Sequence, residues 1–298
     1  MQKHVLIIGH GYVGSELAHS FADDNVPVVV ANRSGDTGLP YPVLEADVSD
    51  LSSVKALSET LPFSPDIIIH CASSSRGGAD AYRSVFLDGI QHLQEAFPGK
   101  PILFTSSTSV YGQTDGSIVT EDSPTNPDRE TSQILIEAEN RVVSQGGIAL
   151  RLAGIYGPGR SIYLQRVLEG RATIEAGETS RFLNQIHRDD IVNAIRFLIE
   201  KSDPDCFGKI FNAVDDTPLT QRECYEQLAA FFQAPVPPEA PPNKERKRAW
   251  TNKVVDNSAL KSTGWTPQFP SFLDALEGDP TFIPSLRAKV EADAASQS

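Results

Sequence analysis

The chain has 298 residues, enough to bury a full α/β core together with a smaller lobe. Its 26 basic and 39 acidic residues give a formal net charge of -13, which argues against nucleic acid or an anionic membrane surface as the main partner. No apolar run approaches the roughly 18 residues that span a bilayer, and no secretory signal pattern opens the chain, so we expect a cytoplasmic protein with no membrane partner.

A short apolar strand over residues 5–8 is followed at once by Gly-His-Gly-Tyr-Val-Gly and then by apolar residues at helical spacing. Strand, GxGxxG turn and helix in this order predict a dinucleotide site, and the alternative is a glycine-rich turn in another kind of α/β protein. The glycines permit a tight turn and close approach to a pyrophosphate, which the helix amino terminus faces with free N–H groups. The predicted cofactor-binding residues of this turn are Gly9, Gly11, Tyr12, Val13 and Gly14.

The alternation of strand and helix continues to residue 151. Regular alternation with short connections implies a parallel, doubly wound sheet of the α/β Rossmann type, because each crossover is right-handed and places helices on both faces. The expected strands are 26–31, 42–45, 66–70, 101–104 and 148–151, and the expected helices are 52–61, 82–93 and 134–142.

Beyond Arg151 this rhythm breaks. A capping box of Thr220 and Glu223 predicts the start of one further helix. Five prolines within 234–242 predict an extended loop or lid, and the basic residues at 244–248 predict a solvated surface or, alternatively, a flap that captures anionic groups. The helix that the capping box opens is expected at 221–232. The remaining expected elements are a helix at 189–200, a strand at 209–212 and a loose helix or tail over the last dozen residues.

The residues after the second strand bear on the choice of cofactor. A Rossmann site for NAD usually ends this strand on an acid that binds the ribose hydroxyl. The sequence has no acid directly there, and Arg33 offers a guanidinium for a 2'-phosphate, with Asn32 and Ser34 as further donors. NADP(H) is therefore favoured over NAD(H), unless Arg33 is merely an exposed turn residue. Asp47 and Val48 are expected near the adenine, although Asp47 could equally cap the next helix.

Eight segments follow one another along nearly the whole chain: GHGYVG, ADVSD, IIIHCAS, FTSSTSVYG, RLAGIYGPG, NQIHRDDI, IFNAVDD and LKSTGWTPQFP. In this order they resemble the extended short-chain dehydrogenase/reductases, also called NAD-dependent epimerase/dehydratases. The resemblance implies a Rossmann domain over 1–151 and, mainly within 152–298, a smaller C-terminal substrate-binding lobe. It also implies that segments of about 184–213 pack back on the first domain, and it places Cys71, Ala72 and Ser73 beside the cofactor.

Chemistry in that family needs a tyrosine, a lysine four residues later and a serine or threonine that binds the reacting oxygen. Ser107 matches the last of these, four residues before Tyr111. Alignment on the flanking segments places Arg129 and Gln133 where the tyrosine and lysine should stand. With this pair missing and Gly154 where many members have asparagine, the chain resembles an atypical branch that includes the YeeZ-like bacterial proteins.

Ser107 and Tyr111 are therefore the catalytic candidates, and Arg129, Tyr156, Arg181 and His187 are the candidates for substrate contact. Four of them have a structural alternative: the tyrosines pack beside the glycines that follow them, His187 caps the helix near residue 189, and Arg181 is a solvated loop residue. The cysteines, Cys71, Cys206 and Cys224, lack CxxC spacing, so we predict no metal site or disulfide.

Two functional hypotheses follow. The first is an NADP(H)-dependent oxidoreductase or epimerase/dehydratase-like enzyme that acts on a small polar or sugar-like substrate with a non-standard proton donor. The second, favoured by the missing pair, is a dinucleotide-binding redox sensor or regulatory protein without turnover. The resemblance also suggests a homodimer through Tyr82, Phe86 and Ile136, although these residues fit core packing equally well.

Overall fold

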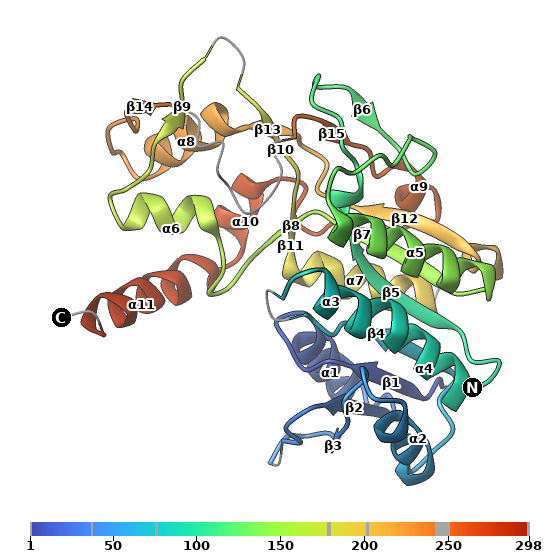
Figure 1. Cartoon of the computed structure of the whole chain (residues 1–298). Coiled ribbons are helices and arrows are strands. Elements are labelled where there is room, and N and C mark those ends of the chain that lie inside the picture. The colour runs from blue at the N-terminus through green and yellow to red at the C-terminus, as the bar shows by residue number, and fades with distance from the viewer. Residues whose placement is uncertain are drawn as a thin grey trace.

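In the computed structural model, which describes residues 2–36, 38–74, 77–177, 180–200, 203–241 and 251–296, a seven-stranded parallel sheet forms the centre of the larger lobe (Figure 1). The strand order is β12-β7-β5-β4-β1-β2-β3, which confirms the predicted doubly wound sheet. The strands are β1 (Val5–Ile8), β2 (Val28–Asn32), β3 (Val43–Glu45), β4 (Ile67–His70), β5 (Ile102–Ser107), β7 (Ile148–Leu152) and β12 (Lys209–Ala213).

Helices cover both faces of this sheet, and therefore its central strands are continuously apolar rather than alternating. One layer consists of α1 (Gly14–Asp23) and α7 (Arg188–Glu200). The other consists of α2 (Leu51–Thr60), α3 (Ala79–Tyr82), η1 (Arg83–Asp88), α4 (Gly89–Ala96) and α5 (Glu130–Ser144). The chain leaves β1 and β4 toward opposite faces, so the carboxyl ends of these neighbouring strands border the crevice where Rossmann folds bind ligands.

Two strands differ from their predicted bounds by two residues or more at one end. β2 begins at Val28 because Val26 still donates its N–H to Phe21 at the end of α1, and Pro27 has no N–H. β5 continues to Ser107, which pairs with Leu152 of β7, so hydrogen bonding extends the strand through polar residues that hydrophobicity alone did not assign to it.

The helix predicted at 82–93 spans 79–96 and contains a π-helical stretch, η1. Within that stretch the carbonyl of Val85 lies 3.0 Å from Nε2 of the buried His70. Phe86 is buried, and Tyr82 and Ile136 pack against the same core. Packing in the core, the alternative to a dimer surface, therefore accounts for the spacing of these three apolar residues.

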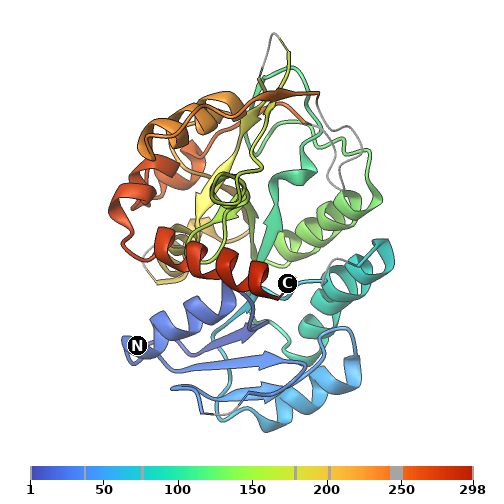
Figure 2. The same ribbon diagram turned by 90° about the vertical axis from the view of Figure 1, so that its left-hand side faces the viewer.

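A second hydrophobic cluster builds the smaller lobe, at the upper left of Figure 1. Its helix α8 begins with the predicted capping box of Thr220 and Glu223. The expected C-terminal tail is a helix, α11, which crosses in front of the sheet lobe in Figure 2. The elements of this lobe are α6 (Ile162–Leu168), β9 (Ile174–Glu175), α8 (Gln221–Phe231), β14 (Glu239–Ala240), α10 (Phe272–Gly278) and α11 (Phe282–Ala295).

The proline-rich segment is not wholly an extended loop, and the prediction was wrong for β14. The N–H of Ile174 donates to the carbonyl of Pro238, and the N–H of Ala176 donates to that of Ala240, at 3.0 and 2.8 Å. Proline lacks a donor but keeps its acceptor, so it can join a sheet edge. The basic residues 244–248 lie outside the described residues.

Short strand pairs lie outside the central sheet. β8 (Gly154–Tyr156) pairs with β11 (Gln185–His187), and β6 (Ile118–Val119) pairs with β15 (Val254–Val255). An antiparallel pair joins β10 (Phe182–Leu183) to β13 (Leu219–Thr220). The other short helices are η2 (Thr108–Val110), η3 (Pro204–Cys206) and α9 (Ser258–Ser262). Among the described residues, no helix combines the length and apolar character needed to cross a bilayer.

Candidate functional site

The glycine turn follows β1 at the carboxyl edge of the sheet. Gly9 has a φ of +104°, and a Cβ there would lie 2.6 Å from the backbone of Ala72. A Cβ at Gly14 would lie 2.1 Å from the carbonyl oxygen of Gly9. At Gly11, by contrast, no described atom lies within 4 Å of the Cβ position. The protein's own packing thus requires Gly9 and Gly14, whereas Gly11 borders open space that fits a pyrophosphate.

Tyr12 joins this turn to the loop after β8. Its hydroxyl donates to the carbonyl of Pro158 over 2.9 Å, and the guanidinium groups of Arg160 and Arg188 lie 5.3 and 5.4 Å from its ring centre. Burial raises the pKa of Tyr12 to about 12, so the hydroxyl stays protonated. Val13 is the buried N-cap residue of α1. A ligand on the glycine turn would therefore lie beside the loop after β8.

An acidic residue does lie near the end of β2. Asn32 Oδ1 accepts from the backbone N–H groups of Ser34 and Gly35 at 3.1 and 2.7 Å. This turn brings back Asp36, whose Oδ2 accepts from Asn32 Nδ2 at 2.8 Å and lies 3.1 Å from Nδ1 of His10. The Asn32 amide thus serves the turn, but its Nδ2 keeps a second proton, so donation to a 2'-phosphate stays a prediction.

Arg33 and Ser34 are exposed on this turn, which fits the alternative of an exposed turn residue equally well, so their contact with a 2'-phosphate stays a prediction. Sequence reasoning missed Asp36 because it considered only the residues directly after the strand. The available signal was Asn32 followed by Gly35, a pair typical of a tight turn that reverses the chain.

Asp47 follows β3 and forms a local turn. Its carboxylate accepts from the N–H and the hydroxyl of Ser49 at 2.9 and 2.6 Å. The N-cap of α2 is instead Asp50, so the capping alternative for Asp47 is wrong. Val48 is buried against Gly89. Contact of Asp47 or Val48 with an adenine stays a prediction.

The residues after β4 line the glycine turn. The N–H of Cys71 donates to the carbonyl of Ile8 over 2.8 Å, and burial raises the pKa of the Cys71 thiol to about 12. A protonated, packed thiol is a poor nucleophile. Ala72 lies against Gly9, and Ser73 follows on the same edge. Their contact with a cofactor stays a prediction.

Ser107 ends β5 on this edge of the sheet. Its Oγ accepts from the N–H of Ser109 at 3.2 Å, and it is half-buried. Because a hydroxyl both donates and accepts, Ser107 keeps its own proton for a ligand oxygen. The hydroxyl of Ser132, in the first turn of α5, lies 3.4 Å from that of Ser109. The start of α5 therefore flanks the loop after β5.

Arg129 and Gln133 occupy that start of α5. Arg129 is the N-cap residue, and Gln133 Nε2 donates to the carbonyl of Pro127 over 3.2 Å. Neither a guanidinium nor an amide can take a proton from a substrate at neutral pH. Arg129 is half-buried and keeps its place as a candidate for an anionic substrate.

The structure does not support Tyr111 as a catalytic residue, because its ring is fully buried. Its hydroxyl accepts from Arg151 Nη1 at 2.7 Å and lies 2.9 Å from Asn212 Oδ1 and from the carbonyl of Thr120. Arg151 in turn forms a buried ion pair with Glu139, with Nη2 and Oε2 2.7 Å apart. Tyr111 therefore anchors the loop after β5 to the neighbouring strands.

Tyr156 and His187 face each other across β8 and β11 and are 1% and 0% exposed, which argues against substrate contact. His187 Nδ1 accepts from the N–H of Asp189 at 3.2 Å, which confirms the alternative that His187 caps α7. Its Nε2 lies 3.2 Å from Asp279 Oδ2. Burial lowers the pKa of His187, so the ring is neutral and carries one proton. Because Nδ1 accepts a hydrogen bond, that proton sits on Nε2, on the side of Asp279. Neither Nε2 nor Asp279 Oδ2 has a hydrogen-bond partner of good geometry among the described residues, and Asp189 Oδ2 lies 3.9 Å from Nδ1. The three side chains offer possible ligand atoms within 4.8 Å of one another.

Arg181 is neither solvated nor open to an anionic ligand. Its Nε lies 3.2 Å from Oε2 of Glu175, and its Nη2 donates to the hydroxyl of Tyr163 over 3.2 Å. Both partners of the ion pair are largely buried. The structure therefore assigns Arg181 to the packing of the smaller lobe.

Lys253 is a buried cation that sequence reasoning missed. Its Nζ donates to the carbonyl of Tyr111 over 2.9 Å and to the hydroxyl of Thr251 over 3.3 Å. Burial lowers the pKa of Lys253 to about 8. The β6–β15 pairing brings this segment to the loop after β5, and only long-range pairing could reveal it. Lys253 thus helps to hold the loop that begins at Ser107.

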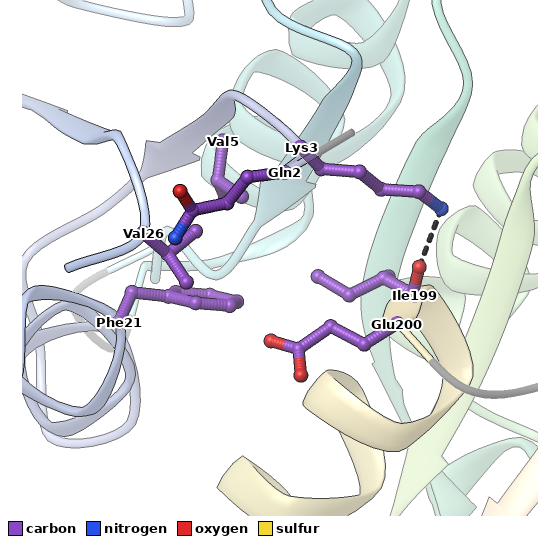
Figure 3. A pocket seen from close by; sticks show the side chains of 7 residues that line it. All are labelled: Gln2, Lys3, Val5, Phe21, Val26, Ile199 and Glu200. Atoms are coloured by element: carbon purple, nitrogen blue, oxygen red, sulfur yellow. Dashed lines mark hydrogen bonds between the residues drawn. The ribbon is translucent and has the colours of Figure 1, made fainter. Parts of the chain in front are cut away.

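A separate shallow pocket opens at the amino end of β1, at the edge of the sheet opposite the glycine turn (Figure 3). The side chain of Lys3 extends across it and donates to the carbonyl of Ile199. The pocket therefore lies away from the candidate site. Its lining residues are Gln2, Lys3, Val5, Phe21, Val26, Ile199 and Glu200.

Comparison with known proteins agrees with this architecture. The model of the NAD dependent epimerase/dehydratase family matches residues 5–213. Protein YeeZ of Escherichia coli (strain K12) is 27% identical over 285 residues, which cover 90% of this chain and 97% of that protein.

Solved structures share the fold along nearly the whole chain. The UDP-glucose 4-epimerase of Thermus thermophilus, in complex with NAD, is 20% identical with a TM-score of 0.77, over 95% of this chain and 99% of that one. The UDP-glucose 4-epimerase of Thermotoga maritima, with UDP-glucose, is 18% identical with a TM-score of 0.75, over 99% of this chain and 100% of that one.

Proposed function

Because this chain belongs to the NAD-dependent epimerase/dehydratase family, we propose that it binds a nicotinamide dinucleotide, NADP(H) in preference to NAD(H). We propose further that it acts as an oxidoreductase or epimerase/dehydratase-like enzyme on a small polar or sugar-like substrate. In this proposal residues 1–151 hold the cofactor and residues 152–298 supply most of the substrate-binding surface.

The observation that carries the proposal is the open space at Gly11. Gly9 and Gly14 have no room for a side chain because of neighbouring backbone, but Gly11 has room and still lacks one. A glycine without an internal reason fits a turn that a pyrophosphate approaches closely. The amino terminus of α1 adds a partial positive charge on the same side.

The preference for NADP(H) depends on the guanidinium of Arg33, which directly follows β2. A guanidinium can hold a 2'-phosphate by two parallel hydrogen bonds, which a ribose hydroxyl does not offer. The sugar-like class of substrate is supported by the relatives in the same fold, one of which was solved with UDP-glucose.

When bound, a nicotinamide supplies a centre that accepts or donates hydride. The chain's own contribution is Ser107, whose proton can bind the reacting oxygen and stabilise charge on it. Tyr111, Arg151 and Lys253 hold the loop that carries Ser107 and so act as positioning residues. Arg129, at the start of α5, would bind an anionic group of the substrate.

A second candidate function is dinucleotide binding without turnover, as in a redox sensor or regulatory protein. The observation that favours it is the pair Arg129 and Gln133, neither of which can replace the family's tyrosine and lysine in proton transfer. A sensor would bind the cofactor and consume none of it.

The test begins with titration of the purified protein with NADPH and NADH, followed by cofactor fluorescence, for wild type and Arg33→Ala. Tight NADPH binding that weakens selectively in the variant supports the proposal, whereas no binding of either cofactor overturns it. A screen with UDP-sugars and NADP+ then follows cofactor reduction by absorbance and sugar products by chromatography, because an epimerase or dehydratase returns the cofactor to its starting state. Reduction or product formation that Ser107→Ala lowers supports the enzyme, and cofactor binding with neither across the screen supports the sensor.

A further inference from the structure

We propose that the pair His10 and Asp36 sets how strongly this chain discriminates between NADP(H) and NAD(H), with protonation of His10 admitting the 2'-phosphate. The inference rests on the proposed function, since it concerns the cofactor site. It adds a specificity-determining pair outside the turn residues Asn32, Arg33 and Ser34.

The first step is the position of the pair. His10 lies between Gly9 and Gly11, and the Gly9 N–H donates to the carbonyl of Ala31 over 2.8 Å, which sets His10 beside the end of β2. Asp36 returns to the same place through the Asn32 turn. The pair therefore stands at the carboxyl ends of β1 and β2, where Rossmann folds hold the adenosine ribose of a dinucleotide.

The second step is accessibility. The side chain of Asp36 is 43% exposed and that of His10 is 13% exposed, and Nδ1 and Oδ2 lie 3.1 Å apart. The carboxylate can therefore meet a ligand directly, while the imidazole lies behind it and changes its charge balance. A ribose hydroxyl can donate to such a carboxylate, but a 2'-phosphate carries about -1.5 to -2 charge and is repelled by it.

The third step is that His10 has a partner in both protonation states. An ionised carboxylate only accepts, so Nδ1 donates to Asp36. Nε2 lies 3.0 Å from the hydroxyl of Tyr41, which can donate to a neutral ring or accept from a protonated one. His19 Nδ1 carries a proton that it donates to the carbonyl of Ser15 at 2.8 Å, so it cannot accept a hydrogen bond from the Tyr41 hydroxyl, which lies 3.1 Å away. The proton of that hydroxyl is therefore available to His10. Gain of a proton thus costs His10 no hydrogen bond.

The fourth step is the charge around the pair. Asp36 faces His10 from the turn after β2, and the same turn carries Arg33. Tyr41 faces His10 from the segment before β3. Glu16 and His19, on α1, lie near Tyr41. Burial, Glu16 and Asp36 raise the pKa of Tyr41, which therefore stays neutral. When His10 is protonated, its positive charge balances the negative charge of Asp36. When His10 is neutral, the negative charge of Asp36 counteracts the attraction of Arg33 for a 2'-phosphate. Histidine is the side chain whose charge changes between pH 5 and 8.

The experiment measures Kd of NADPH and of NADH by fluorescence titration at pH 6.0, 7.0 and 8.0, at fixed low ionic strength. Wild type is compared with His10→Gln and Asp36→Asn. His4→Gln is the matched control, because His4 Nδ1 also lies near an aspartate, 3.3 Å from Asp66 Oδ2, at the far end of β1. The 2'-phosphate itself titrates near pH 6, but it does so equally in every variant.

We expect the ratio Kd(NADH)/Kd(NADPH) to fall about fivefold from pH 6 to 8 in wild type and His4→Gln, the size of one unit charge at close range in water. In His10→Gln the ratio should stay near the wild-type value at pH 8. In Asp36→Asn it should rise above the wild-type value at pH 8, because the carboxylate that repels the 2'-phosphate is gone.

An unchanged ratio in both site variants, with both cofactors still bound, overturns the inference and leaves the proposed function intact. Failure of wild type to bind either cofactor at any pH overturns the proposed function itself. If His10→Gln does not fold, Asp36→Asn decides alone, because the exposed carboxylate contributes no core packing.

Discussion

The Tyr111 hydroxyl accepts a hydrogen bond from Nη1 of Arg151 over 2.7 Å, in the fully buried space between β5, β7 and β12. A tyrosine four residues after the candidate serine resembles a catalytic group in the sequence, yet its hydroxyl is saturated by protein partners. The pair connects the loop that carries Ser107 to the central sheet.

Tyr111→Phe should therefore lower stability and leave cofactor affinity nearly unchanged. The change leaves a buried donor of Arg151 without its acceptor, which costs about 1–3 kcal/mol. The measurement is the free energy of unfolding in urea, together with an NADPH titration. The matched control is Tyr156→Phe, because the equally buried Tyr156 hydroxyl has no hydrogen-bond partner among the described residues. Equal losses in the two variants would contradict the anchoring role.

The ion pair between Arg151 and Glu139 should be costly to break from one side. Its side chains are 4% and 1% exposed, so Glu139 would be left as a buried, uncompensated charge in Arg151→Met. We expect a loss of about 3–5 kcal/mol in the free energy of unfolding. The double variant Arg151→Met/Glu139→Gln should recover part of it.

The control for that series is Arg83→Met, because Arg83 and Glu137 form an exposed pair, 46% and 53% exposed, at 3.6 Å. Exposed pairs contribute about 0–1 kcal/mol, so this loss should be small. A large loss for Arg83→Met, or none for Arg151→Met, would show that burial does not govern these pairs.

The pattern of apolar residues predicted the central sheet well, because parallel strands covered on both faces, such as 67–69, are continuously apolar. It predicted β5 too short, because Thr105 to Ser107 are polar and are held in the strand by pairing with β7. Local pattern indicates burial, but hydrogen bonding to a distant strand decides where an element ends.

The candidate site was less predictable for the same reason. Gly9, Gly11 and Gly14 are contiguous in sequence, so their motif could be read directly. Asp36 comes to the site through a turn, and Lys253 comes through a strand pair with residues near 118. Tyr111 lies in a motif, but only the tertiary contact with Arg151 shows which way its ring points.

Lys253 should make stability depend on pH in the alkaline range. Burial lowers its pKa from 10.5 to about 8 in the folded state. Between these values the unfolded state binds more protons, so the free energy of unfolding rises with pH from about 8 to 10.5, and the full cost of the buried charge is present below pH 8. That cost is up to about 3 kcal/mol, partly offset by about 1 kcal/mol from the bond to the Tyr111 carbonyl.

Lys253→Met should accordingly be more stable than wild type at pH 7, by up to about 2 kcal/mol, and should lose this advantage by pH 10. Thermal unfolding at pH 7, 8, 9 and 10 measures the difference. Lys209→Met, at an exposed position of β12, is the control and should give a difference that does not change with pH. A Lys253→Met variant that is less stable than wild type at every pH would show that hydrogen bonding outweighs the buried charge.

The three glycines of the turn should respond differently to alanine, although the motif treats them alike. Gly14→Ala places a Cβ 2.1 Å from the carbonyl oxygen of Gly9, so the start of α1 must shift and thermal stability should fall. Gly11→Ala meets nothing within 4 Å and should fold with near-native stability, while its methyl group occupies the space left for the pyrophosphate. We expect NADPH affinity to fall at least tenfold in Gly11→Ala, a change of about 1.4 kcal/mol. Calorimetric titration beside a melting curve separates the two effects. If Gly11→Ala binds NADPH as tightly as wild type, the cofactor does not use this turn and the open space at Gly11 has another origin.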